Sequence, residues 1–165
     1  MAKRDATGPV TLSVLDRLID RDPKNRFEAP LTRPQSLREL KLGLKRDLEW
    51  LLNTRITIDP APESARETNR SVYNYGFADI SSKSVLSTRD QSDLVRDMEL
   101  AIALFEPRLK RARVRMEEVE GSYRSLKFVI EGLLCMDPAP EPIRFDTVLE
   151  LSKGEYEVKG ADLAQ

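Results

Sequence analysis

The sequence predicts an α+β fold in which N-terminal helices pack on a mainly antiparallel sheet of three to four strands. Two observations predict this class. Before Pro107, apolar residues recur at three- and four-residue spacing, which is typical of helices. After Pro107 they alternate with polar residues, which is typical of strands. Because the helices come first and the strands second, the class is α+β.

The N-terminal part is expected to hold one short helix and an extended linker, over residues 1–35. In the segment 10–19 the apolar residues share one helical face. That face consists of Leu12, Leu15, Leu18 and Ile19. Residues 21–35 hold three prolines among charged residues and are interpreted as the linker.

A longer helix is expected from Ser36 to about residue 53. Ser36 and Glu39 have the spacing of a capping box, and leucines follow at helical spacing. Those leucines are Leu37, Leu40, Leu44, Leu48, Leu51 and Leu52. Gly43 weakens the helix slightly. Trp50 lies off the leucine stripe, and we expect it to pack on a neighbouring element.

An aromatic loop and another helix come next. Residues 71–77 place three aromatic side chains around Asn74 and Gly76, which predicts an ordered loop. We expect Tyr75 and Gly76 to be structural, with Gly76 adopting a backbone angle that other residues resist. A helix capped by Ser87 or Thr88 then runs to Pro107, with Leu94, Val95, Met98, Ala101, Ile102 and Phe105 on its inner face.

Three strands follow. The first buries Ala112, Val114 and Met116 and exposes Arg111, Arg113, Arg115 and Glu117. The second begins at about residue 125 after a turn at 120–122; in it, Gly132 indicates a bulge or close packing. In the third strand, the inward-facing residues are Ile143, Phe145, Leu149 and Leu151. A short edge piece is expected at 155–158. We therefore expect one domain over residues 36–158 and a frayed tail over 159–165.

Composition excludes several kinds of chemistry. The 165 residues include no histidine, which excludes a Ser-His-Asp triad, a Cys-His pair and a histidine-ligated metal within this chain. Cys135 is the only cysteine, so an intrachain disulfide and a thiolate zinc cluster are excluded as well. Neither a membrane-spanning apolar run nor a signal core is found, and we expect a cytoplasmic protein without cofactor.

Glu106, Pro107 and Arg108 stand where the helical pattern changes to the strand pattern. Pro107 removes a backbone donor and biases Glu106 away from helical geometry, so two opposite charges are held at a rigid corner. Such a corner suits recognition better than catalysis. An internal ion pair that fastens the corner is the simpler alternative, and would contribute about 0–1 kcal/mol if exposed.

Arg111, Arg113 and Arg115 on one strand face raise the question of phosphate binding. The net charge of −1 and the lack of a nucleic-acid motif argue against nucleic acid. We expect these arginines to pair with acids such as Glu131 or Glu150 on neighbouring strands. Charged outer strands discourage random edge pairing while permitting one partner strand.

Four signatures occur in order: the segment 46–55, the segment 71–76, Glu106-Pro107-Arg108, and the three strands. Together they resemble the TssE family, the baseplate wedge subunits of bacterial type VI secretion systems. That family is similar to the lysozyme-like wedge proteins of contractile phage tails. The resemblance covers roughly residues 10–155.

The resemblance implies a structural protein without catalytic residues, in a baseplate docked at the inner membrane. Glu106, Pro107 and Arg108 would contact the core helical bundle of the TssF–TssG wedge. The sheet over 111–151, with Arg111, Arg113 and Arg115, would face the sheath subunits TssB and TssC and help to start their polymerisation. TssK and the VgrG spike are further candidate partners. No contact with nucleic acid and no insertion into the membrane are expected.

Two alternatives stay open. One is a peptidoglycan hydrolase, suggested by the lysozyme-like label of the family. A glycosidase needs two carboxylates across a sugar-sized cleft, and here no pair is marked by its local context. Glu106 has an arginine beside it, which makes it a poor general acid. The other alternative is a wedge protein of a related phage tail-like particle.

Overall fold

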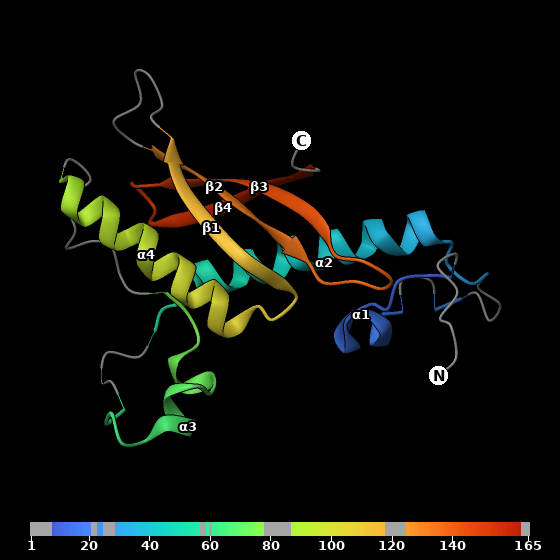
Figure 1. Ribbon diagram of the computed structural model, residues 1–165, viewed down its shortest axis with the longest axis horizontal. Helices are drawn as coiled ribbons and strands as arrows, with labels where there is room; N and C mark the ends of the chain where they lie inside the picture. Colours follow the sequence, from blue (N-terminus) through green and yellow to red (C-terminus); the bar gives the residue numbers. More distant parts are fainter. Residues whose placement is uncertain are drawn as a thin grey trace.

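A computed structural model describes residues 8–20, 23–24, 29–56, 59, 61–77, 87–117 and 125–162. It contains two layers, with helices α2 (Arg33–Asn53) and α4 (Thr88–Phe105) packed against a four-stranded sheet (Figure 1). Three shorter helical segments are α1 (Val14–Leu18), α3 (Arg66–Asn69) and η1 (Val72–Asn74). This arrangement confirms the predicted α+β class.

The sheet is an antiparallel meander of β1 (Leu109–Glu117), β2 (Ser125–Leu134), β3 (Glu141–Glu150) and β4 (Glu155–Asp162), in that order. The predicted alternation holds in β3, where Ile143, Phe145 and Leu149 are buried. β4 extends past the expected end at residue 158 to Asp162. The turn expected at 120–122 lies outside the described residues, as does the end of the chain from residue 163.

β1 contains a bulge opposite Gly132. Lys110 pairs with Leu133 and Arg113 with Glu131, so two residues of β1 face one residue of β2. Arg111 has a φ of 53°, a left-handed conformation that suits glycine better. A Cβ on Gly132 would lie 2.7 Å from Leu109 Cδ1, which confirms the expected close packing there.

α2 begins earlier than predicted, and the prediction that Ser36 and Glu39 form its capping box was wrong. Thr32 is the N-cap, and its N–H donates to the Gln35 side chain at 2.9 Å. Pro34 fits into the first turn. Proline has no backbone N–H, and an N–H at this position of a helix would have no carbonyl partner within the helix. Ser36 already lies in the helix, where its hydroxyl accepts from the Val10 N–H at 2.9 Å and donates to the Arg33 carbonyl at 3.0 Å.

The leucine stripe of α2 is buried as predicted, except that Leu37 is half-buried, whereas Trp50 is exposed. Its side chain is 52% exposed, with the Arg46 guanidinium 5.0 Å from the ring centre. Gly43 has a specific use, because a Cβ there would lie 2.6 Å from the Asp16 carboxylate. The short helix α1 can thus lie against α2, while its apolar residues, among them Leu15 and Leu18, stay exposed.

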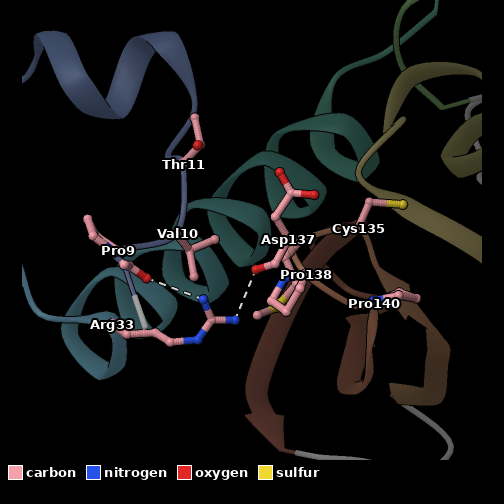
Figure 2. A pocket seen from close by; sticks show the side chains of 10 residues that line it. Pro9, Val10, Thr11, Arg33, Cys135, Asp137, Pro138 and Pro140 are labelled. Atoms are coloured by element: carbon pink, nitrogen blue, oxygen red, sulfur yellow. Dashed lines mark hydrogen bonds between the residues drawn. The ribbon is translucent and has the colours of Figure 1, made fainter. Parts of the chain in front are cut away.

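Arg33 fastens the N-terminal segment to the turn between β2 and β3 (Figure 2). Its Nη1 donates to the Gly8 carbonyl at 3.2 Å and its Nη2 to the Asp137 carbonyl at 2.9 Å. The adjoining hollow of about 830 Å³ is lined mainly by small residues and prolines, with the exposed thiol of Cys135 at its wall. The guanidinium is therefore engaged by the chain itself.

Candidate functional site

The corner between α4 and β1 is built around Glu106, the C-cap of α4. Its N–H donates to the Ile102 carbonyl at 2.9 Å, and its carbonyl accepts from the Leu109 N–H at 3.1 Å as β1 begins. Pro107 between them is exposed, whereas the Glu106 side chain is only 6% exposed. The corner therefore presents a rigid proline above a buried carboxylate.

Arg108 holds that carboxylate in a two-pronged ion pair. Its Nε donates to Glu106 Oε1 at 2.7 Å and its Nη2 to Oε2 at 2.5 Å. Nη2 also donates to Asp47 Oδ2 of α2 at 2.6 Å. The hydrogen bond to Glu106 raises the pKa of Arg108, although burial acts in the opposite direction. In the isolated chain, Glu106 and Arg108 therefore form the internal ion pair that was the simpler expectation.

The ion pairs continue from this corner to α1. Arg46 lies within 2.8 Å of Asp47 Oδ1 and donates through Nη1 to Asp16 Oδ1 at 2.7 Å. Burial would raise the pKa of Asp16, but hydrogen bonds from Ser13 and Arg46 outweigh it and lower that pKa. We call Asp16, Arg46, Asp47, Glu106 and Arg108 the charged network. It joins α1, α2 and the α4–β1 corner.

A small hollow of about 270 Å³ lies beside the corner, lined in part by Tyr75, Phe105 and Pro107. The ring of Tyr75 meets Phe105 edge-on, with 5.3 Å between the centroids. Burial and the nearby carboxylates of Asp47 and Glu106 raise the pKa of Tyr75. Tyr75 thus forms part of the wall of the candidate site.

Gly76 holds the aromatic loop against the end of α2. Its φ is 128°, and a Cβ there would lie 2.5 Å from the Thr54 carbonyl oxygen. The following residue, Phe77, donates its N–H to the same carbonyl at 2.7 Å. Only glycine permits this close approach, as the sequence indicates.

The three predicted arginines of β1 differ in their surroundings. Arg115 Nη2 donates to Glu131 Oε1 at 2.5 Å, which confirms one expected cross-strand pair. Arg113 lies 3.6 Å from Glu99 of α4. Arg111 occupies the bulge. Glu150, the other acid expected as a partner, instead pairs with Lys153 at 2.7 Å. Of these three arginines, Arg115 alone therefore pairs with an acid of the sheet within the described ranges, and Arg111 has no ion pair there.

Two polar side chains with a role at the sheet edges were not predicted. Asn53 of α2 donates to the Tyr156 carbonyl and accepts from the Tyr156 N–H, both at 2.8 Å, as a neighbouring strand would. At the opposite edge, Glu99 accepts from the Val114 N–H at 2.9 Å. The spacing of apolar residues contains no signal for either contact, because each joins a polar side chain on a helix to the backbone of a strand, 103 positions away for Asn53 and 15 for Glu99.

The corner offers a proline, a guanidinium and an aromatic wall, which suit protein recognition. Within the described ranges, no group of three or more Asp, Glu, Cys or His residues could hold a metal ion. None of the described helices is both long and apolar enough to cross a bilayer.

Comparisons with known proteins show the family of the chain. No curated protein matches the chain at a significant level. The family model described as "Baseplate wedge protein gp25" matches residues 38–139, which is more than half of the chain and includes most of α2, the aromatic loop, α4, the corner and β1–β2. The family resemblance drawn from the four signatures is thereby confirmed. The chain belongs to the baseplate wedge protein gp25 family and has a structural role in a phage-like baseplate.

Proposed function

We propose that the chain is the wedge subunit of a type VI secretion baseplate, where it binds TssF and TssG and links the baseplate to the contractile sheath. The observation that supports this most is the corner itself. Glu106 and Arg108 are already bonded to each other beneath an exposed Pro107. A partner can therefore bind a fixed surface without first ordering these side chains, which lowers the entropic cost of binding.

The guanidinium of Arg108 is used mainly within the chain. Its Nε and Nη2 bond to Glu106 and Asp47, while Nη1 is buried and has no acceptor among the described residues. The core helical bundle of the wedge would therefore meet the exposed Pro107 and the wall of the hollow rather than this nitrogen. We place that bundle against the hollow beside Pro107 and Tyr75.

The other proposed contacts follow from the family. The sheet would face the sheath subunits TssB and TssC and help to start their polymerisation, and Arg111, Arg113 and Arg115 would take part in that contact. TssK and the VgrG spike complete the proposed set of neighbours. The assembled baseplate would lie in the cytoplasm against the inner membrane.

Co-purification with the wedge subunits tests the corner. Arg108→Glu places a third carboxylate beside Glu106 and Asp47, so it is expected to weaken the fold as well as the interface. Pro107→Tyr is the cleaner variant, because it adds bulk at an exposed position and leaves the ion pair in place. We expect Pro107→Tyr to lose TssF and TssG while it keeps the wild-type melting temperature.

A matched control separates charge effects from specific contact. Arg89 is exposed near the start of α4, where a glutamate is favourable, so Arg89→Glu should co-purify like the wild type. If Pro107→Tyr and Arg108→Glu both retain the wedge subunits, the corner is not the binding site.

We also propose that the protein is not an enzyme. Glu106 is the acid singled out by its setting, and both of its oxygens accept hydrogen bonds from Arg108. Both oxygens are therefore already bonded to the chain's own arginine and are not free to act on a substrate. Soluble sugars released from purified peptidoglycan, and lost with Glu106→Gln, would show the proposal to be wrong. Neighbouring genes distinguish a secretion system from a related phage tail-like particle, which the family match equally permits.

A further inference from the structure

We propose that a groove between α4 and β1 binds an acidic amphipathic helix of a partner protein. The groove is open to solvent and has a volume of about 780 Å³. It is lined by Arg96, Glu99, Leu100, Ala103, Leu109, Lys110, Arg111, Ala112 and Arg113. It shares none of these residues with the hollow beside Pro107, so it is a second surface, independent of the corner.

The groove carries positive charge that the described part of the chain does not neutralise. Its single acid, Glu99, is already engaged by the Val114 N–H and lies 3.6 Å from Arg113. Arg96, Lys110 and Arg111 are exposed and have no ion pair within the described ranges. Clustered cations of this kind attract carboxylates and oppose basic partners.

The wall formed by α4 is apolar where a partner would lie. Leu100 is 58% exposed and Ala103 is exposed beside it. Leu104, one turn after Leu100, is exposed as well and extends the same stripe. An exposed leucine stripe flanked by cations is complementary to a helix that has apolar residues along its centre and acids along its sides.

A helix fits this groove better than an added strand. The bulge at Arg111 interrupts the edge of β1. In addition, the Val114 N–H, which an added strand would need as a donor, already donates to the Glu99 carboxylate. A helix satisfies its own backbone and needs only side-chain contacts. A nucleic acid would use the cations but gain nothing from Leu100, so we favour the protein helix.

Direct binding to synthetic peptides tests the proposal with the purified full chain. The probe is a fluorescein-labelled peptide of about 18 residues, long enough to form a helix in isolation, with a leucine stripe flanked by glutamates. One control replaces each glutamate with lysine, and another scrambles the order at constant composition. By fluorescence anisotropy we expect the acidic amphipathic peptide to bind, the scrambled one to bind at least about tenfold more weakly, and the basic one not to bind.

Paired variants then locate the site. Arg96→Glu combined with Lys110→Glu, and separately Leu100→Gln, should each weaken binding of the acidic peptide by about tenfold or more. The controls are Arg89→Glu on the same helix and Leu42→Gln at another exposed leucine, on α2, and both should bind like the wild type. Circular dichroism confirms that every variant is folded.

Four results would overturn the proposal: no binding of the acidic peptide, equal binding of the basic or scrambled peptide, unchanged binding by the groove variants, or tighter binding of a short duplex DNA. The assay uses the isolated chain. Its failure would therefore leave the proposed contact at Pro107 untouched, and a failed co-purification would not bear on the groove.

Discussion

Replacing Arg108 by methionine tests how the corner is held together. Methionine keeps much of the side-chain length but removes the guanidinium that bonds to Glu106 and Asp47. The Glu106 carboxylate, only 6% exposed, then has no cation beside it, whereas Asp47 keeps Arg46 at 2.8 Å. The expected loss of stability therefore arises almost entirely at Glu106.

The size of that loss follows from burial. Removing one partner of a buried ion pair costs about 3–5 kcal/mol, whereas an exposed pair contributes about 0–1 kcal/mol. Glu106 is buried, but the Arg108 and Asp47 side chains are 22% and 23% exposed, so water reaches one side of the cluster. We therefore expect about 3 kcal/mol, the low end of the buried range. For a chain of this size that lowers the melting temperature by about 6–12 °C.

Urea unfolding and thermal melting followed by circular dichroism measure the effect. Arg115→Met is the matched control, because it breaks a pair whose arginine is 64% exposed and should cost at most about 1 kcal/mol. A melting temperature equal to that of Arg115→Met would refute the reasoning.

Four further substitutions test the sheet. The Tyr156 hydroxyl is buried without a partner among the described residues, so Tyr156→Phe should be neutral or more stable by up to about 1 kcal/mol in urea unfolding. Burial raises the pKa of Tyr156 above its ordinary 10.0, so this tyrosine ionises more readily in the unfolded chain than in the folded one. Ionisation therefore destabilises the wild type as the pH rises past 10.0, and the gain in stability from Tyr156→Phe should grow there. Arg111→Gly removes the strain of a non-glycine residue at a φ of 53° and should raise the free energy of unfolding by about 0.5–1 kcal/mol. Gly132→Ala should lower it by about 1–3 kcal/mol, because the new Cβ crowds Leu109. Urea unfolding measures both. Asn53→Ala frees one edge of β4 and should cost about 1–3 kcal/mol and increase self-association in light scattering.

The elements could be predicted because their signals are local. The change from a helical to a strand period at Pro107 places α4, the corner and β1 correctly. The start of α2 was misplaced because Thr32–Gln35 and Ser36–Glu39 both resemble caps, and the Ser36 hydroxyl is used by the amide of Val10. The spacing of apolar residues does not show which of two adjacent candidate caps is used, because tertiary contacts decide it.

Apart from the Glu106–Arg108 pair, which was the simpler alternative, the charged network could not be predicted, because the contacts that join its elements link residues far apart along the chain. Arg46 and Asp16 are 30 positions apart, and Arg108 and Asp47 are 61 apart. The same reason explains the error at Trp50. Its position off the leucine stripe suggested a neighbouring element, but α1 meets α2 at Gly43 and the tryptophan stays exposed beside Arg46. Side chains at such junctions depend on how the helices meet.

The closed sheet edges bear on the proposed link to the sheath. Asn53 supplies both hydrogen bonds that a neighbouring strand would give to Tyr156, and Glu99 supplies one to Val114. A sheath strand that replaced either side chain would exchange hydrogen bonds of the same kind, so the net gain from the backbone is small. The side chains of the incoming strand must then provide the binding energy. This arrangement protects the free subunit from edge-to-edge association and leaves strand addition to a partner with a complementary surface.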